Sequence, residues 1–358
     1  MNASAEEPPT SGDRFPSFTA AAVQAAPVFL DREATLDKLA TLVAEAARRG
    51  ARLIAFSESF VPAFPVWNLV LAPLDQHHLF RALYENAVPV PSEQTDRMAA
   101  LARRHDVYLS VGITERSAVS MGAVYNTNLL FDPSGRLLNR HRKLVPTWAE
   151  KLTWAPGDGS QLRPAETEIG RIGALICGEN TNTLARYALL AQGEQVHIAS
   201  YPPAWPFRRP GTTHNYNLTR AIEIRSAAHA FEGKVFNIVS SGVLDEHAIQ
   251  EISKVDPRAE EVLRSAPPSA SMVIHPTGEV CGGPVVGDED IVYAAIDVAD
   301  SIEAKQAHDI VGYYQRFDIF RLQLDQRPQR PIELIREPRL GDEAPPEVAD
   351  SESPEPEQ

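Results

Sequence analysis

The sequence contains very little cysteine and no long apolar run. Two cysteines in 358 residues cannot form a disulfide framework, so a reducing, cytoplasmic setting is expected. No apolar stretch approaches the roughly 20 residues that a membrane helix needs. The first residues are acidic and rich in proline, without the basic-then-apolar order of a secretory signal. These absences argue against a disulfide-rich secreted protein and against a membrane protein.

An excess of positive charge is also absent. Lys and Arg number 34 against 48 Asp and Glu, a formal net charge of −14, whereas nucleic-acid binding requires basic groups gathered against phosphate. The sequence has no H-E-x-x-H motif, no Cys/His pair at metal spacing, no P-loop motif, and no G-x-G-x-x-G after a strand-like run. It therefore predicts no nucleic-acid partner, no metal and no nucleotide cofactor.

The chain divides into a long central region and two polar tails. Residues 1–16 and about 337–358 are expected to be disordered, the latter because they are acidic, rich in proline and poor in core-forming residues. Residues 17–325 form the expected domain, and 326–358 form a C-terminal extension.

Hydrophobic periodicity in the central region predicts an α/β fold. The expected strands are 18–27, 51–58, 107–115, 196–202 and 234–242, and the expected helices are 35–49, 96–105, 184–192 and 213–232. Turn residues predict a hairpin around 132–135, a hairpin or strand at 168–177, and two further strands at 271–280 and 290–298. The similar order in the two halves indicates two mixed sheets packed together and flanked by helices.

Cys177 ends the apolar run IGALI, and a polar segment separates it from the next helical pattern. Enzymes of the α/β class place nucleophiles at such strand ends, where free backbone N–H groups lie nearby. Gly178 permits a substrate to approach the backbone closely. The alternative is a small buried core thiol. The other cysteine, Cys281 in EVCGGP, is expected at a turn between two strands, in a structural role.

Two charged residues also follow strand-like runs. Glu58 lies after RLIAF, where burial would raise its pKa towards that of a general base, unless the side chain faces water. Lys143 closes RLLNRHRKL and is suited to stabilise a thiolate and developing negative charge, unless it belongs to a solvated basic turn. Charge patterning leaves both alternatives open. The proline-stiffened loop FVPAFPVWN after Glu58 suits a pocket wall.

The order Glu, Lys, Cys, each after its own strand-like run, resembles the nitrilase superfamily of carbon–nitrogen hydrolases over about residues 18–325. The segments that carry the resemblance are AFSESFVPAFPVWN, NRHRKLVPTWAEKLTWAPGDG, GALICGENTN, QGEQVHIASYPPAWP and DIVGYYQRFDIFRL. The runs H-R-K-L-x-P-T-x-x-E and D-x-V-G-x-Y-x-R-x-D resemble the nitrilase branch in particular.

This resemblance implies a four-layer αββα sandwich, no cofactor, and homodimers that assemble into larger homo-oligomers. It implies Cys177 as the nucleophile, Glu58 as the general base and Lys143 as the charge stabiliser. Glu150, seven positions after Lys143, would be a second carboxylate that positions substrate and water.

The sequence departs from the family pattern at three places and leaves the pocket undefined. Ser57 stands where Pro is frequent and Tyr313 where His is usual, while Gly178 replaces the Trp that follows the cysteine in many nitrilases. The last change alters the pocket floor, so no particular nitrile is predicted. Four aromatic residues near the catalytic segments either line a cleft or pack a core or subunit interface: Trp67, Trp148, Tyr201 and Trp205.

The expected reaction is hydrolysis of an organic nitrile to a carboxylic acid and ammonia, through thioimidate and thioester intermediates on the cysteine. An amidase or N-carbamoyl hydrolase would use the same Glu-Lys-Cys set on an amide carbonyl. A catalytically silent oligomeric interaction module is the third hypothesis, although binding alone does not need such a set of residues.

Overall fold

The computed structural model describes residues 14–212, 216–330 and 332. The predicted disorder of 1–16 and 337–358 falls almost entirely outside these residues. No helix in the described part of the chain combines the length and the apolar character needed to cross a membrane.

Two mixed β-sheets form the centre of the molecule. The first has the order β13-β1-β2-β4-β5-β6, with β3 paired to β4, and the second has the order β12-β11-β10-β9-β8-β7. The strands of the first sheet are β1 (Ser17–Gln24), β2 (Ala51–Ala55), β3 (Val88–Pro89), β4 (Tyr108–Arg116), β5 (Val124–Phe131), β6 (Leu137–Arg142) and β13 (Asp290–Asp297). Those of the second are β7 (Ala165–Thr167), β8 (Gly170–Ile176), β9 (Val196–Tyr201), β10 (Phe236–Ser241), β11 (Ala270–Ile274) and β12 (Val280–Val286).

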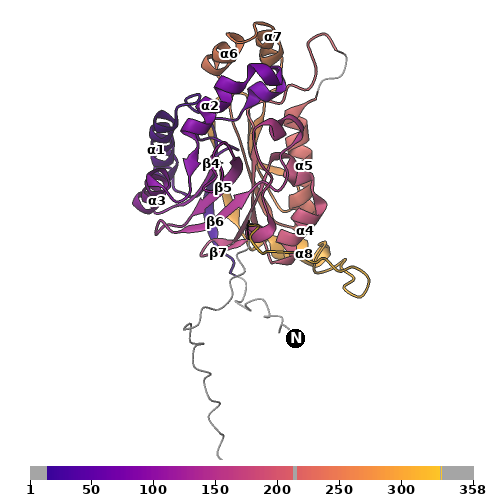
Figure 1. Ribbon diagram of the computed structural model, residues 1–358. Coiled ribbons are helices and arrows are strands. Elements are labelled where there is room, and N and C mark those ends of the chain that lie inside the picture. Colours follow the sequence, from indigo (N-terminus) through magenta and orange to yellow (C-terminus); the bar gives the residue numbers. More distant parts are fainter. Residues whose placement is uncertain (1–13, 213–215, 331, 333–358) are drawn as a thin grey trace, which may run out of the picture.

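Helices cover the outer face of each sheet. They are α1 (Arg32–Arg48), α2 (His77–Asn86), α3 (Glu93–His105), α4 (Thr183–Ala191), α5 (Leu218–Gly233), α6 (Glu246–Ser253), α7 (Arg258–Arg264) and α8 (Asp300–Ala307). In Figure 1, α1 and α3 lie on one side of the sheets, α4 and α5 lie on the other, and α2, α6 and α7 gather at one end. The predicted αββα sandwich of two mixed sheets is confirmed.

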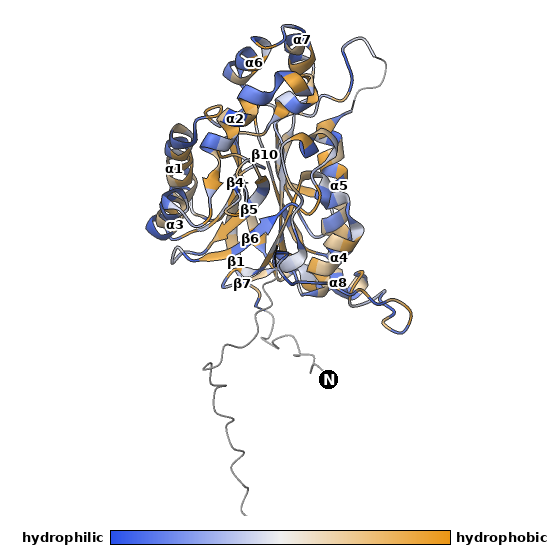
Figure 2. Cartoon of the chain, in the orientation of Figure 1, coloured by the Kyte–Doolittle hydropathy of each residue, from blue (hydrophilic) through white to orange (hydrophobic). Residues whose placement is uncertain are grey.

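The side-chain alternation of β1 shows how the layers are held together. Ala20 and Ala22 lie in the core between the two sheets, whereas Ala21 and Val23 lie in the core beneath α1 and α3. Helices α1 and α3 carry hydrophilic residues among hydrophobic ones, as Figure 2 shows, because only one face of each is buried.

Two local predictions were wrong. The helix expected from Thr213 begins at Leu218, because the Asn217 side chain caps it by accepting a hydrogen bond from the Arg220 N–H. Residues 213–215 lie outside the described residues. Cys281 lies within strand β12 rather than at a turn, and its Sγ donates to the Val273 carbonyl at 3.5 Å. Helices α2, α6, α7 and α8 were not predicted.

Candidate active site

A buried lysine joins two carboxylates. Lys143 directly follows β6, Glu58 lies in the loop after β2, and Glu150 lies in the 3₁₀ helix Trp148–Leu152. Lys143 Nζ donates to Glu58 Oε1 and to Glu150 Oε2, each at 2.7 Å. All three side chains are buried, so water screens their charges poorly.

The thiol of Cys177 lies beside this group. Cys177 directly follows β8, and its Sγ and one carboxylate oxygen each from Glu58 and Glu150 lie within 4.8 Å of one another. Its φ of +52° is in the left-handed region, which costs a non-glycine residue about 1–2 kcal/mol. The surrounding contacts therefore hold the nucleophile candidate in a strained backbone conformation. The structure thus brings Glu58, Lys143, Glu150 and Cys177 together.

Each of the two carboxylates binds Lys143 through only one of its oxygens. Glu58 Oε1 also accepts from Asn126 Nδ2 at 2.6 Å, and Glu150 Oε2 also accepts from the Thr147 N–H at 2.8 Å. Glu58 Oε2 and Glu150 Oε1 are buried and have no hydrogen-bond partner among the described residues. One oxygen of each carboxylate is therefore available to take a proton or to bind a water molecule.

Burial sets the protonation states of the site. It raises the pKa of Glu58 to about 7, against the opposing effect of the Lys143 ammonium. Burial alone would lower the pKa of Lys143, but the carboxylates of Glu150 and Glu58 raise it above its ordinary value. Burial, together with the Glu58 charge, also raises the pKa of the Cys177 thiol well above its usual value. At neutral pH the resting site holds a thiol, an ammonium and a carboxyl close to its own pKa.

Glu179 fastens the lysine segment to the cysteine segment. Its Oε2 accepts from the Ile176 N–H and from His141 Nε2, both at 2.9 Å, and its Oε1 accepts from the Leu144 N–H at 2.8 Å. Burial raises the pKa of Glu179, but His141 and the two N–H groups lower it below its ordinary value, so the carboxylate is ionised. Ile176 and Leu144 are the immediate neighbours of Cys177 and Lys143, so Glu179 sets the distance between them.

Gly112 of β4 allows the Glu58 loop to lie close to the first sheet. A Cβ at this position would collide with the Ser57 carbonyl oxygen and would lie 2.6 Å from the Ser59 nitrogen. Ser59 has a φ of +47°, so the loop turns sharply where it touches Gly112. No motif in the sequence indicates Gly112, Asn126 or Glu179, because nothing separates them from other polar or small residues in strands and turns.

The four aromatic pocket candidates lie in different environments. Trp67, Tyr201 and Trp205 are buried in the same hydrophobic cluster as Cys177, whereas Trp148 is 57% exposed and its ring packs against Phe207. Contact of these residues with a substrate stays a prediction. The Gly178 position is crowded, because a Cβ there would lie 2.8 Å from Thr147 Oγ1.

A small cavity of about 20 Å³ borders Glu58. Such a volume holds little more than one water molecule. Phe29, Phe60 and Phe64 line it, and the last two belong to the loop that the sequence indicated as a pocket wall. None of the four aromatic candidates lines this cavity.

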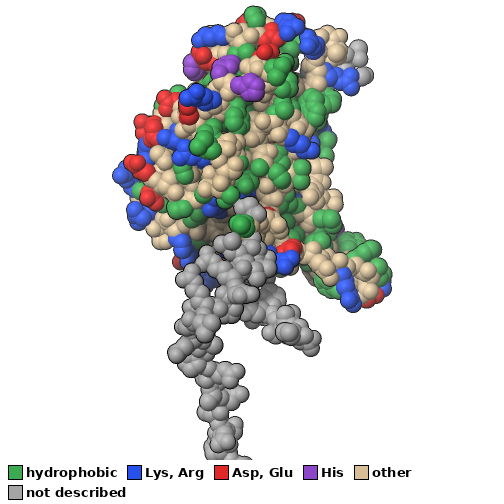
Figure 3. Space-filling view, viewed as in Figure 1, with side chains coloured by type: hydrophobic (Ala, Val, Ile, Leu, Met, Phe, Trp, Pro, Cys, Tyr) green, Lys and Arg blue, Asp and Glu red, His purple; other side chains and the backbone are tan. Residues whose placement is uncertain are grey.

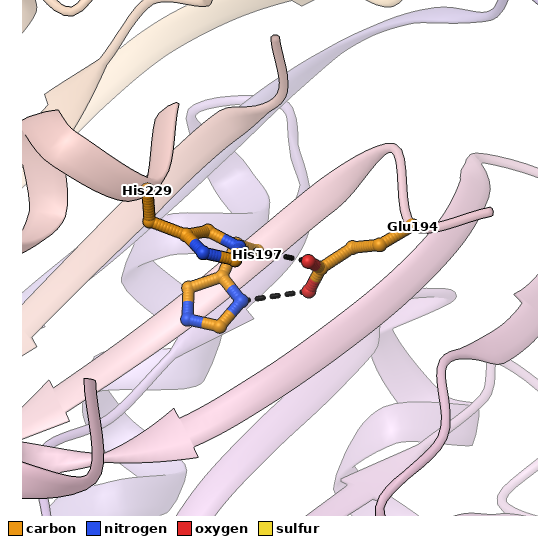
Figure 4. A group of neighbouring side chains, drawn as sticks. All are labelled: Glu194, His197 and His229. Atoms are coloured by element: carbon orange, nitrogen blue, oxygen red, sulfur yellow. Dashed lines mark hydrogen bonds and ion pairs between the residues drawn. The ribbon is translucent and has the colours of Figure 1, made fainter. Parts of the chain in front are cut away.

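Two clusters among the described residues carry the donor atoms of a metal site. In the first, Glu58, Glu150 and Cys177, the Lys143 ammonium already lies 2.7 Å from both carboxylates and would repel a cation. In the second, His197 and His229 each form a hydrogen bond with Glu194 (Figure 4).

Comparison with known proteins agrees with this fold. The family model of carbon–nitrogen hydrolases matches residues 19–306. A nitrilase from Paraburkholderia phymatum is 36% identical over 87% of this chain and 88% of its own length. A nitrilase from a Bacillus species is 35% identical over 90% of this chain and 92% of its own. The crystal structure of a carbon–nitrogen hydrolase from Helicobacter pylori G27 is similar in fold, with a TM-score of 0.66 at 19% identity over 81% of this chain and 92% of that one.

The chain therefore belongs to the carbon–nitrogen hydrolase family, whose members are hydrolases acting on carbon–nitrogen bonds. Its similarity to proteins named nitrilase, over most of both chains, assigns it to the nitrilase branch.

Gly112→Ala is expected to displace the Glu58 loop and to reduce hydrolysis. Overpacking of this kind typically costs about 1–3 kcal/mol of unfolding free energy, which urea denaturation measures. Gly50→Ala is a suitable control, since Gly50 has a φ of +86° in open space and so tests backbone strain without a collision. A Gly112→Ala protein with unchanged activity and stability would contradict the close approach.

Proposed function

We propose that this protein is a nitrilase, which converts an organic nitrile and two water molecules into a carboxylic acid and ammonia. The observation that carries the proposal is the contact of Lys143 Nζ with both Glu58 and Glu150 at 2.7 Å, with Cys177 Sγ beside them. The similarity of the chain to nitrilases over most of its length supports the nitrile as substrate rather than an amide.

The first step forms a covalent thioimidate. Glu58 takes the thiol proton while Cys177 Sγ bonds to the nitrile carbon, and the electrons of one C–N π bond move to nitrogen. Lys143 and the backbone N–H of Gly178 stabilise the negative charge on nitrogen, and loss of one such donor typically costs about 3 kcal/mol in the barrier. A proton then adds to the nitrogen.

Two water additions complete the reaction. The first water adds to the thioimidate carbon with Glu58 as base, and Glu150 Oε1, which has no partner among the described residues, is suited to bind it. The tetrahedral adduct loses ammonia and leaves a thioester, which a second water hydrolyses to the acid and the free thiol. If the adduct lost the Cys177 thiolate instead, the amide would be released.

The reduced state of the Cys177 thiol bears on the cellular compartment in which the protein acts. Both Cys177 and Cys281 are unpaired, and the nucleophile must stay reduced to act. We therefore propose a reducing compartment, such as the cytoplasm.

We also propose that the chain self-associates through the segment 313–324. Its side chains include Tyr314, Phe317 and Phe320, which are 66%, 67% and 66% exposed. Figure 1 shows this yellow segment projecting beyond α8, and Figure 3 shows hydrophobic side chains on the same lobe. Large apolar side chains gathered in this way typically mark an interface. The family resemblance implies homodimers and larger homo-oligomers, so we propose that a second copy of this chain covers the segment.

Cys177→Ala should yield a folded protein that releases no ammonia from any nitrile or amide, because no other group attacks the substrate. Ammonia release from aliphatic, aryl and arylaceto nitriles and from their matching amides measures the effect. Cys281→Ala is the matched control and should retain full activity, since Cys281 lies in β12 outside the site. A preference of the wild type for amides would replace the nitrilase proposal with an amidase. Substantial turnover by Cys177→Ala would remove the nucleophile assignment.

The pH dependence of kcat/KM should report the ionisation of Glu58. A base must be deprotonated to act, and the pKa of Glu58 is raised to about 7. Activity should therefore be constant above neutrality and fall about tenfold per pH unit as the pH decreases below about 7. Glu58→Gln should leave no measurable turnover at any pH. A wild-type profile that stays flat down to pH 5 would contradict the role of Glu58 as the base.

The double variant Phe317→Ser/Phe320→Ser should shift the protein towards smaller species in analytical ultracentrifugation. Leu74→Ser is the control, because Leu74 is 82% exposed but lies elsewhere, before α2. If the double variant sediments like the wild type, the segment is not the interface.

A further inference from the structure

Behind the nucleophile lies a buried cluster that the proposed reaction does not use. Glu194 precedes β9, His197 lies in β9, and His229 lies in α5. The three side chains are completely buried, and both rings bond to the one carboxylate, as Figure 4 shows. His197 Nδ1 lies 2.7 Å from Glu194 Oε1, and His229 Nε2 lies 2.8 Å from Glu194 Oε2.

Asn180 connects this cluster to Cys177. Asn180 Nδ2 donates to the carbonyl of Leu175 at 3.2 Å and to the carbonyl of Cys177 at 3.1 Å. On the other side of the same amide, Asn180 Oδ1 lies 2.9 Å from His197 Nε2. A chain of hydrogen bonds therefore runs from Glu194 through His197 and Asn180 to the backbone of the nucleophile.

The direction of these hydrogen bonds follows from what each group can donate. Carbonyl oxygens only accept, so the Asn180 amide must turn its NH₂ to them and its oxygen to His197. His197 Nε2 must then donate to that oxygen, while Nδ1 donates to the Glu194 carboxylate. Both ring nitrogens of His197 carry a proton, and the ring is a buried cation paired with Glu194.

The protonation states of Glu194 and His229 agree with a doubly protonated His197 ring. Burial raises the pKa of Glu194, but His197 and His229 lower it to about 2, so the carboxylate is ionised. Burial, together with the His197 charge, lowers the pKa of His229 to about 4, so that ring is neutral and donates through Nε2. The cluster as a whole carries no net charge, which fits its complete burial.

A metal ion does not fit these contacts. His197 Nδ1 and His229 Nε2, the nitrogens that would bind the ion, already donate protons to Glu194. His197 Nε2 faces an amide oxygen. Each of these three nitrogens therefore already has a hydrogen-bond partner.

The peptide between Cys177 and Gly178 is the part of the site that this network reaches. It is not among the cis peptides of the described residues, so its C=O and N–H point in opposite directions. Asn180 holds the C=O, which leaves the Gly178 N–H turned away from the network. No described residue accepts a hydrogen bond from this N–H, and a Cβ on Gly178 would meet Thr147, which lies in the loop that carries Glu150.

We propose that Glu194, His197 and Asn180 are positioning residues that orient the Gly178 N–H towards the charge developing on the substrate. This inference rests on the proposed function, in which that N–H stabilises the negative charge. The protonated ring of His197 holds the Asn180 oxygen, which fixes the amide in the one orientation that can donate to Cys177. The network thus acts on the charge stabiliser and leaves the thiol itself unchanged.

Asn180→Asp tests the proposal with almost no change in side-chain volume. The carboxylate can still accept from His197, but it cannot donate to the Cys177 carbonyl and repels it. We expect kcat for nitrile hydrolysis to fall about tenfold or more, with KM nearly unchanged. Outright removal of an oxyanion donor costs roughly 100-fold or more, and here the N–H remains but loses its orientation. Alkylation of Cys177 by iodoacetamide should stay within about twofold of wild type, because that reaction creates no negative charge that the N–H would stabilise.

Asn182→Asp is the matched control. It makes the same chemical change two residues away, where the exposed Asn182 caps α4 and an aspartate caps equally well. Its kcat and its alkylation rate should equal those of the wild type. Asn180→Ala is the second variant if Asn180→Asp does not fold, and it should show the same separation of kcat from alkylation.

Aldehyde binding gives a measurement that does not depend on turnover. Cys177 Sγ adds to the aldehyde carbon, the C=O π electrons move to oxygen, and the thiol proton passes by way of Glu58 to that oxygen, which gives a thiohemiacetal. The oxygen of the adduct lies where the negatively charged nitrogen of the nitrile would lie, and so faces the Gly178 N–H. The Kd of butyraldehyde or phenylacetaldehyde should therefore rise about tenfold in Asn180→Asp.

Three outcomes separate the claims. A wild type that hydrolyses neither nitriles nor amides would end the proposed function, while the aldehyde affinity would still test the network. Equal losses in kcat, alkylation and aldehyde affinity would overturn the proposal in favour of general misfolding of the site. Unchanged kcat and aldehyde affinity in the folded Asn180 variants would overturn it directly.

Discussion

The whole site depends on one ammonium group placed between two buried carboxylates. Without Lys143, Glu58 and Glu150 would be two like charges removed from water, which is strongly unfavourable. Burial, together with the Glu150 charge, raises the pKa of Glu58 to about 7, and the Lys143 ammonium opposes a further rise. The lysine therefore does more than stabilise charge in a reaction. It lets a carboxylate exist in a dry site, where burial keeps the pKa of that carboxylate high enough for it to accept a proton.

The fold meets this electrostatic constraint by bringing three loop segments close together. Ser59, Trp148 and Cys177 all have φ between +46° and +52°, and each lies beside or within the segment of a residue of the candidate site. Left-handed backbone at non-glycine residues persists only where the surrounding contacts dictate it. Here the contacts include Gly112 beneath the Glu58 loop and the Glu179 carboxylate between the lysine and cysteine segments.

The fold and the principal residues could be predicted because they leave periodic or ordered signals. The sequence alone shows the apolar runs of strands such as β8 and β9. It also shows the order Glu58, Lys143, Cys177. It does not show the roles of Asn126 and Glu179, since these roles come from contacts 68 and 35 positions away, which a sequence does not display. The start of α5 was also misjudged, because the helical pattern extends through Thr213 although the cap is Asn217. The exposure of Trp148 likewise depends on a sharp turn that its hydrophobicity does not reveal.

Two consecutive residues, Glu179 and Asn180, hold the backbone around Cys177. Glu179 binds the backbone before Cys177 to the end of β6, and so ties the thiol to Lys143. Asn180 binds the backbone after it to His197 in β9, and so ties the peptide to the second sheet. The first link fixes where the Cys177 sulfur lies, and the second fixes where the following N–H points. Because one link is anchored by an ionised carboxylate and the other by a protonated ring, both include charge-assisted hydrogen bonds, which are stronger than neutral ones. The strained turn at Cys177 is therefore held by electrostatic contacts as well as by packing.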